Sequence, residues 1–491
     1  MAEPRAAFTT KAAPVLIVGA GIFGLSTAIH AARRGYTNIT VYDHQNYEKN
    51  QYEFEEGCDA ASADINKIVR TAYGDQVEYQ EMCTEAINEW LKWNTELASG
   101  NDLPPHMSSK DRVFINNGCT SLNGTTSMHN YDIDSIASMR AAGLKNSALI
   151  TSDKQDQSEA KRQGLAFAID PFNRQKRGLP YTSLLDTTAG YAIAHKACWL
   201  ALHKAKRLGV HFVLGGHKGT LKELCYKDKA QTEISGITTM DGKFHAGSLV
   251  LVACGGWTPS LVTELDGLCE TTAGSVAFVK IPRGSTLFER FSPENFPTFM
   301  YKMGGGKNGG LYGFARDDRG QMKIGYRGTK YTNPTMQADG KVRSVPVTRW
   351  TRPFHTSQIP GHALNIINQF IDEELPEIRA EGLGVTSTRL CWYTDTFDDH
   401  YLIDYVPGKK NLMVATGGSG HAFKFLPVIG RHVVDIWEGK ETNTLPKKNW
   451  LWRKQVMGET PYNVIMQGHD GPNVLSNSNL VSAGVQNMAK L

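Results

Sequence analysis

The sequence lacks the patterns that mark several classes of protein. Its 491 residues contain no apolar run long enough to cross a membrane, and residues 1–13 lack the apolar segment of a secretory signal. None of the eight cysteines forms a Cys-x-x-Cys pair, which argues against a zinc site or a disulfide framework and favours a reducing compartment. The formal net charge is only +4, so nucleic-acid binding is not expected.

Residues 15–43 carry the clearest pattern. An apolar run at Val15–Val18 leads into Gly19-Ala20-Gly21-Ile22-Phe23-Gly24, then into a helical stretch and a second apolar run that ends at Asp43. The first glycine permits a tight turn, the second lets a pyrophosphate approach the backbone, and the third lets the helix pack on the strand. The terminal acid suits a ribose hydroxyl. The pattern predicts a dinucleotide site, with FAD and NAD both open and a ligand-free glycine turn as the alternative.

Periodicity predicts helices and strands along the rest of the chain. Helices are expected over residues 78–97, 131–142, 158–163, 187–208 and 364–375. Strands are expected over residues 210–214, 233–238, 244–252, 276–281, 310–314, 321–327 and 412–416. The apolar run that ends at Gly255-Gly256-Trp257 indicates a second place where the backbone approaches a nucleotide.

Nucleotide-type elements recur in separated parts of the chain, with other material between them. We therefore expect an α/β (α+β) fold, in which a discontinuous Rossmann-like domain carries an inserted antiparallel-sheet substrate domain. The first domain is expected to comprise residues 10–100, 181–270 and 390–440. The second is expected to comprise residues 101–180 and 271–389, and residues 441–491 are expected to form a surface tail.

Between about residues 15 and 439, the chain resembles the flavin amine oxidases of the sarcosine oxidase, pipecolate–saccharopine oxidase and fructosyl amino acid oxidase (amadoriase) group. Besides the glycine motif, the segments that carry the resemblance are Asn66-Lys67-Ile68-Val69-Arg70-Thr71-Ala72-Tyr73-Gly74, Lys323-Ile324-Gly325-Tyr326, Cys391-Trp392-Tyr393-Thr394-Asp395-Thr396 and Gly417-Gly418-Ser419-Gly420-His421-Ala422-Phe423-Lys424. The resemblance implies FAD as the cofactor and a discontinuous FAD-binding domain.

The resemblance also implies individual roles. Cys391 would form a thioether to the flavin, Lys323 would activate oxygen, and Arg70 and Lys424 would hold the substrate carboxylate. A cation stabilises negative charge that develops on oxygen, and an arginine fork suits a carboxylate. Without the motifs, a buried core cysteine and solvated surface charges are the ordinary interpretations. Arg70 favours N-alkyl amino acids over sugar adducts, because amadoriases tend to lack arginine there.

Three positions depart from the sarcosine oxidase pattern. Lys67 stands where an arginine lies near the flavin, Arg327 replaces a histidine, and Ala422 replaces a glycine, which together predict a reshaped pocket. The predicted catalytic set is Lys323, Lys67, Arg70, Lys424, Tyr73, Tyr326 and Arg327, with core packing as the alternative for the two tyrosines. The predicted cofactor-binding residues are Gly19, Gly21, Ile22, Phe23, Gly24, Asp43, Ser62, Lys67, Gly255, Trp257, Cys391, Gly418, Gly420, His421, Ala422, Phe423 and Lys424. No metal ligands are expected.

The predicted function is oxidation of the C–N bond of a secondary amine, an N-methyl or cyclic amino acid, by FAD and molecular oxygen. The products would be an imine or iminium and hydrogen peroxide, and the imine would then be hydrolysed or trapped by intramolecular cyclisation. The alternatives are a fructosyl amino acid oxidase, an NAD-dependent dehydrogenase and a flavoprotein without chemistry. The C-terminal Ala489-Lys490-Leu491 is a variant of the peroxisomal address and predicts a peroxisomal import receptor as partner, with a cytoplasmic location as the alternative.

Overall fold

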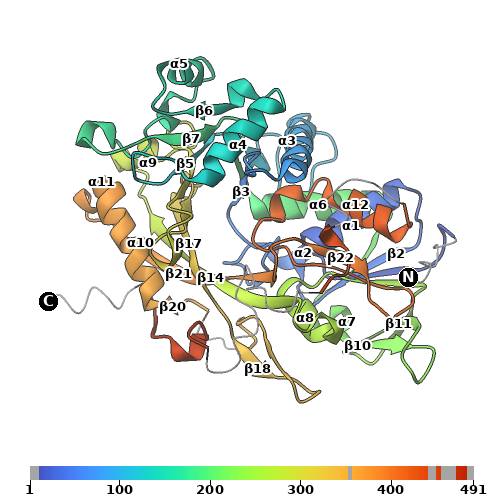
Figure 1. Cartoon of the computed structure of the whole chain (residues 1–491). Coiled ribbons are helices and arrows are strands. Elements are labelled where there is room, and N and C mark those ends of the chain that lie inside the picture. Colours follow the sequence, from blue (N-terminus) through green and yellow to red (C-terminus); the bar gives the residue numbers. More distant parts are fainter. Residues whose placement is uncertain (1–9, 352–355, 441–448, 455–470, 484–491) are drawn as a thin grey trace.

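The computed structural model describes residues 10–351, 356–440, 449–454 and 471–483. Its first layer is a six-stranded sheet that is parallel except at one edge (Figure 1). The strands, in spatial order, are β22 (Leu402–Tyr405), β23 (Leu412–Thr416), β13 (Leu249–Val252), β1 (Val15–Val18), β2 (Ile39–Asp43) and β9 (His211–Leu214). Because parallel strands are buried on both faces, their sequences read as continuous apolar runs.

Three helices pack together against one side of this sheet, namely α1 (Ile22–Arg33), α6 (Ala194–Arg207) and α12 (Ile429–Trp437) (Figure 1). The long helix α3 (Val77–Ala98) adds its apolar face to the same core. Close approach of α1 depends on two glycines. A Cβ at Gly24 would lie 1.8 Å from the Gly19 carbonyl oxygen, and one at Gly430 would lie 2.1 Å from the Ser26 carbonyl oxygen. The third glycine of the motif therefore has the packing role that its spacing predicts.

The second layer is an eight-stranded sheet. Its strands, in spatial order, are β21 (Val385–Thr396), β14 (Cys269–Lys280), β17 (Gln321–Tyr331), β16 (Leu311–Gly313), β15 (Thr298–Tyr301), β5 (Cys119–Leu122), β7 (Ser183–Asp186) and β6 (Ala148–Ile150). Neighbours are antiparallel except for β5 and β15. Helix α10 (Gly361–Glu374) covers one face through a phenylalanine-rich core, while α4 (Asn130–Ala141) and α5 (Lys154–Arg162) lie near β6 and β7 (Figure 1).

Smaller elements connect the layers. A three-stranded sheet contains β3 (Lys67–Val69), β8 (Gly190–Ala192) and β4 (Phe114–Ile115). The remaining strands are β10 (Leu221–Tyr226), β11 (Ile234–Thr239), β12 (Phe244–Ala246), β18 (Pro334–Met336), β19 (Val342–Ser344), β20 (Ile359–Pro360) and β24 (Leu480–Val481). The remaining α-helices are α2 (Tyr47–Asn50), α7 (Gly216–Gly219), α8 (Thr258–Leu261), α9 (Thr286–Arg290) and α11 (Pro376–Ala380). None of the described helices has the length and apolar character needed to cross a membrane.

The mixed α/β fold class is confirmed, with corrections at particular elements. The helix expected over 187–208 begins only at Ala194, because β8 precedes it and pairs with β3 and β4. Three strands of the eight-stranded sheet do not respect the predicted domain boundaries: β7 lies wholly within the segment 181–270 assigned to the first domain, β14 crosses the boundary after residue 270, and β21 crosses the boundary after residue 389. The division into two domains therefore stays a proposal whose borders follow the sheets.

The expectation of a surface tail after residue 440 is wrong for part of the described chain. Trp450 is fully buried against Tyr401, with ring centroids 5.1 Å apart, and its Nε1 donates to the Tyr79 hydroxyl at 2.9 Å. Arg453 makes a bidentate pair with Asp398, at 2.6 and 2.5 Å, and donates to the Tyr401 carbonyl at 3.0 Å. We call residues 449–454 the C-terminal clip. Its Trp450 is buried because it completes the packing of the turn before β22.

Replacing Arg453 with alanine is expected to loosen this turn. The change removes a charge-assisted pair and its backbone bonds, so the free energy of unfolding should fall by about 2–3 kcal/mol. Denaturant unfolding measures it. The control is Arg162→Ala, which breaks an ion pair on α5 whose arginine side chain is 68% exposed, against 19% for Arg453. That control should cost less than about 1 kcal/mol. Equal losses in the two variants would contradict a structural role for the clip.

Candidate active site

A cavity of about 510 Å³ opens at the carboxyl ends of β1, β2 and β13. This is the edge of a parallel sheet at which ligands bind in open α/β folds. The cavity is lined by most of the predicted cofactor residues, namely Gly19, Gly21, Ile22, Phe23, Asp43, Ser62, Lys67, Gly255, Trp257, Gly418, Gly420, Ala422 and Phe423. Its volume is in the usual range for small-molecule and cofactor sites.

The glycine loop offers backbone donors to an anion. Gly19 has a φ of 107°, and a Cβ there would lie 2.3 Å from the Ala253 carbonyl oxygen, so only glycine fits. Helix α1 begins at Ile22 with no side-chain cap and no acid in its first turn. Its first N–H groups are therefore open to a phosphate.

Asp43 lies at the end of β2 and lines the same cavity. Its Oδ2 accepts from the Ala20 backbone N–H at 2.7 Å, and its Oδ1 accepts from the Gln45 N–H at 2.8 Å. Burial raises the pKa of this carboxyl. A carboxylate fixed beside backbone donors is the set that a ribose and a pyrophosphate require, so the residues present fit a dinucleotide such as FAD.

Asp64 is the centre of a buried charge cluster near Lys67, which lines the cavity. Its Oδ2 pairs with Lys323 Nζ at 2.7 Å and with Lys67 Nζ at 2.9 Å, and its Oδ1 pairs with Arg389 at 2.8 Å. Burial alone would raise the pKa of Asp64, but the three cations outweigh it and hold that pKa well below its usual range. The cluster brings together residues from β3, β17 and β21.

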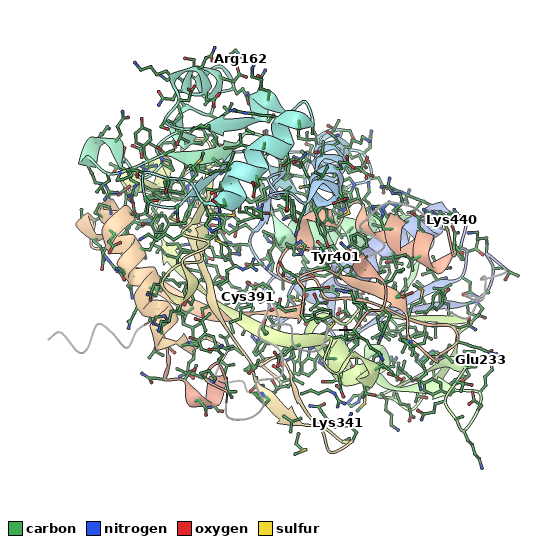
Figure 2. All side chains as sticks on the ribbon, in the orientation of Figure 1. Arg162, Glu233, Lys341, Cys391, Tyr401 and Lys440 are labelled. Carbon is green, nitrogen blue, oxygen red and sulfur yellow. The ribbon has the colours of Figure 1, made fainter. Side chains whose placement is uncertain are left out.

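Lys323 is fully buried and also donates to the Asn66 carbonyl at 2.7 Å. Burial lowers the pKa of Lys323 to about 8, Asp64 opposes that shift, and the charge of Lys67 adds to it. Lys67 Nζ lies 3.5 Å from the Cys391 sulfur. Cys391 and Tyr401 lie toward the middle of the molecule, whereas Arg162, Glu233, Lys341 and Lys440 lie at its periphery (Figure 2).

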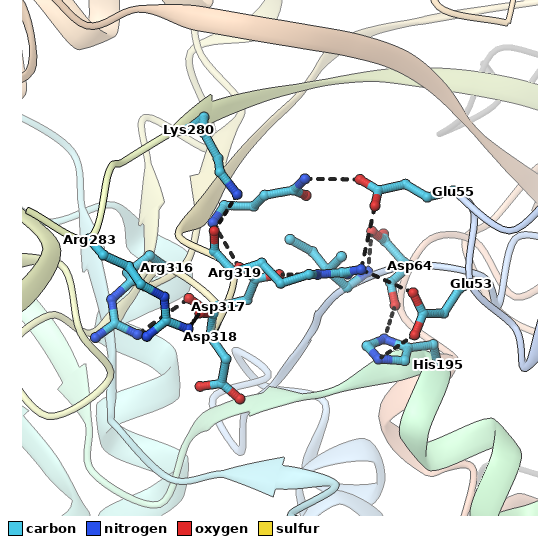
Figure 3. Close-up of polar contacts among 12 residues, drawn as sticks. Glu53, Glu55, Asp64, His195, Lys280, Arg283, Arg316, Asp317, Asp318 and Arg319 are labelled. Carbon is cyan, nitrogen blue, oxygen red and sulfur yellow. Dashed lines mark hydrogen bonds and ion pairs between the residues drawn. The ribbon is translucent and has the colours of Figure 1, made fainter. Parts of the chain in front are cut away.

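The backbone of Asp64 is held from the opposite side. The His195 N–H, at the start of α6, donates to the Asp64 carbonyl at 3.1 Å. Around it, Arg319 on the turn before β17 pairs with Glu53 at 3.0 Å and with Glu55 at 3.4 Å (Figure 3). The start of α6 therefore holds the backbone of Asp64, and Arg319 joins the turn before β17 to the segment that contains Glu53 and Glu55.

Arg70 and Lys424 form a second group of cations. The Arg70 guanidinium lies over the Tyr73 ring, 4.9 Å from its centroid, and donates to the Tyr131 hydroxyl at 3.0 Å. Lys424 Nζ lies 4.5 Å from the same Tyr73 centroid and donates to its hydroxyl at 2.7 Å. Neither cation forms an ion pair with a carboxylate in the described residues. Burial, followed by the like charge of Arg70, lowers the pKa of Lys424 to about 7.

His421 connects this group to the turn held by the C-terminal clip. Its Nε2 lies 2.9 Å from the Asp399 carbonyl, which can only accept, so Nε2 carries the proton. Burial and the charge of Lys424 hold the pKa of His421 well below its usual value. The ring is therefore neutral, and its Nδ1 accepts from the hydroxyls of Tyr73, at 3.1 Å, and Tyr401, at 3.0 Å.

Some predicted residues are placed elsewhere. Tyr326 was expected to border the pocket, but it is fully buried in the core under α10, and its hydroxyl donates to the Lys307 carbonyl at 2.6 Å. The reason is strand alternation, which turns it to the face opposite Lys323. Four predicted cofactor residues do not line the cavity, namely Gly24, Cys391, His421 and Lys424. Gly24 packs against the Gly19 carbonyl instead.

Sequence reasoning missed other residues of this region. They are Asp64, Tyr79, Tyr131, Arg389, Trp450 and Arg453. Asp64, Tyr79 and Arg389 lie close in sequence to the motifs that contain Asn66, Gly74 and Cys391, so their positions carried a local signal. Tyr131, Trp450 and Arg453 lie far from the motifs in sequence and are brought there by the fold.

Comparisons with known proteins agree with this site. The chain is 28% identical to the L-saccharopine oxidase of Schizosaccharomyces pombe, over 90% of this chain and 93% of that protein. It is 25% identical to the N-methyl-L-tryptophan oxidase of Salmonella dublin, over 87% and 95%. A crystal structure of a fructosyl peptide oxidase mutant has the same fold, with a TM-score of 0.75, 24% identity and coverage of 96% and 99%.

The expected resemblance to flavin oxidases is thus confirmed, and FAD rather than NAD is the cofactor that the relationship supports. The model of the family described as "FAD dependent oxidoreductase" matches residues 14–436. The chain belongs to the FAD-dependent oxidoreductase family.

Proposed function

We propose that the protein oxidises the C–N bond of a secondary amine that bears a carboxylate, using FAD and molecular oxygen. The observation that carries this proposal is the pair of cations, buried Lys424 and part-buried Arg70, that both lie against the Tyr73 ring. Buried charges are normally paired, because leaving water without a partner costs several kilocalories per mole. A substrate carboxylate would supply the missing charge and would restore the full charge of Lys424.

The side chains around this pair would orient the substrate. Lys424 donates to the Tyr73 hydroxyl, which leaves the Tyr73 proton for His421 Nδ1. Because His421 is held neutral, it adds no charge and keeps Tyr73 in place. FAD, when bound, would accept a hydride from the carbon next to nitrogen and pass the electrons to oxygen. The amine loses two electrons and two hydrogens, oxygen becomes hydrogen peroxide, and the imine is hydrolysed or cyclises.

Lys323 would be the group that favours the reaction with oxygen. With a pKa of about 8, its Nζ is mostly protonated at neutral pH. A fixed ammonium in a buried site stabilises negative charge as it develops on oxygen. Asp64 supports this role because it keeps the proton on Lys323 despite the burial.

A thioether between Cys391 and FAD is the second part of the proposal. It is supported by the family motif and by Lys67, which lies 3.5 Å from the sulfur and also lines the cavity. An ammonium at this distance stabilises negative charge on sulfur.

Peroxisomal import is proposed from the sequence alone, since residues 489–491 lie outside the described residues. A peroxide-forming enzyme suits that compartment.

The covalent link predicts a simple spectroscopic result. After denaturation and removal of small molecules, the visible flavin bands should stay with the polypeptide. They should be lost in Cys391→Ser, while Cys254→Ser, at a cysteine that itself lines the cavity, should keep them. Flavin that washes off the unaltered chain would mean that Cys391 is an ordinary core residue and would leave the FAD assignment intact.

The reaction itself is tested by hydrogen peroxide formation. N-methyl-L-amino acids should be oxidised, and fructosyl-glycine should be a poor substrate because Arg70 favours the former class. A clear preference for the sugar adduct would overturn the use of Arg70.

The role of Lys323 is tested separately. Lys323→Met should slow reoxidation of the reduced enzyme by about 100-fold or more, as for loss of a preorganised charge at a reacting centre. Lys341→Met, at an exposed site, is the control.

Carboxylate binding should depend on pH through Lys424. Its pKa is lowered to about 7, so the ammonium is present below that pH and is lost above it. The dissociation constant of propanoate should therefore rise above pH 7, by at most about tenfold per pH unit. Calorimetric titration of the FAD-loaded protein measures it. Lys424→Arg, which keeps its charge, should remove the rise, and a pH-independent constant in the unaltered protein would refute the assignment.

A further inference from the structure

Arg327 is a third cation beside the proposed carboxylate site. Along β17, side chains alternate between the two faces of the sheet, so Lys323, Gly325 and Arg327 share the face opposite Tyr326. The pairing of β17 with β14 is regular as far as Tyr326 and Ser275, and its register shifts beyond them. The contact of Arg327 Nη1 with the cavity residue Gly420 places this side chain on the cavity side of the sheet.

The guanidinium of Arg327 comes up to the cavity wall. A Cβ placed on Gly420, which lines the cavity, would lie 3.3 Å from Arg327 Nη1 and 3.1 Å from the Tyr393 ring. The backbone of Arg327 is anchored separately, since its N–H donates to the Gly310 carbonyl at 2.9 Å. The side chain is thus positioned by its strand and is free to bind a ligand.

The charges of two acids, Asp399 and Asp395, act on Arg327 without forming an ion pair with it. Asp395 Oδ1 has no hydrogen-bond partner among the described residues, and its Oδ2 is engaged by other side chains. It pairs with Lys330 Nζ at 2.7 Å and accepts from the Thr272 hydroxyl at 2.5 Å. Across the described ranges of the chain, the Arg327 guanidinium makes no hydrogen bond and no ion pair. The positive charge acts on its surroundings, because Arg327 adds to the burial and to the Arg70 charge that lower the pKa of Lys424.

One substrate carboxylate would be shared by Arg70 and Lys424 and would leave the Arg327 fork without a partner. We propose that Arg327 binds a second carboxylate, so that the substrate is an N-(carboxyalkyl) amino acid in which each carbon group on the nitrogen carries a carboxylate. This inference rests on the proposed function. An arginine fork recognises a carboxylate in bidentate geometry, which lysine cannot reproduce. The departure from the sarcosine oxidase pattern at this position then has a chemical reason.

The test uses two amines that differ by one carboxylate, N-ethyl-L-alanine and N-(1-carboxyethyl)-L-alanine. The FAD-loaded protein should bind the dicarboxylate at least about tenfold more tightly in anaerobic calorimetry, the scale of one charge-assisted contact. It should also oxidise the dicarboxylate with a correspondingly lower KM. In Arg327→Met that preference should vanish, through KM rather than kcat, while binding of the monocarboxylate changes little.

Two further variants keep the test decisive. Arg327→Lys should retain only part of the preference, and Lys341→Met, at an exposed position, should retain all of it. Flavin content and the thermal unfolding midpoint show that each variant is folded. Equal binding of the two amines by the unaltered protein, or a preference that survives in Arg327→Met, would overturn the role of Arg327. Preferential binding without oxidation of either amine would uphold Arg327 and instead refute the proposed function.

Discussion

The carboxylate of Asp64 is the contact on which the site depends. It is 1% exposed and meets Lys67 from β3, Lys323 from β17 and Arg389 from β21. Removing one partner of a buried ion pair costs about 3–5 kcal/mol, because the other charge stays behind without water. A single acid therefore joins the strand that follows the nucleotide unit to two strands of the eight-stranded sheet. It also keeps the lysine that belongs to the proposed oxygen chemistry charged.

The two groups of cations differ in how they are balanced. Lys67, Lys323 and Arg389 share Asp64, so their charges belong to the protein's own structure. Arg70, Lys424 and Arg327 form no ion pair among the described residues, and burial, followed by the like charges of Arg70 and Arg327, lowers the pKa of Lys424. In our proposal, substrate carboxylates balance these charges. The contrast separates cations that the fold itself pairs from cations that the proposal assigns to substrate binding.

The packing behind the site includes the C-terminal clip, which the sequence did not indicate. The turn at residues 398–401, whose Asp399 carbonyl holds His421, is fixed by Trp450 and Arg453 of the C-terminal clip. His421 in turn contacts Tyr73, and Tyr73 contacts Lys424. The proposed substrate-binding residues are thus supported by a segment that composition alone assigned to the surface.

The sequence by itself determined the nucleotide unit, because its glycines, apolar strands and terminal acid act on neighbours that are close in the chain. Local geometry is enough to place Gly19, Gly21 and Asp43 at one edge of a sheet. The motifs also predicted roles for Lys323, Arg70 and Lys424, and these roles stay predictions. Composition and periodicity could not predict which groups lie beside these cations, because charge pairing depends on strands that meet only after folding. Tertiary structure decided that Tyr326 faces the core, that β8 interrupts a helix-forming stretch, and that Arg327 stands unpaired at the cavity wall. Each of these follows from strand pairing and alternation between distant segments, which no local pattern specifies.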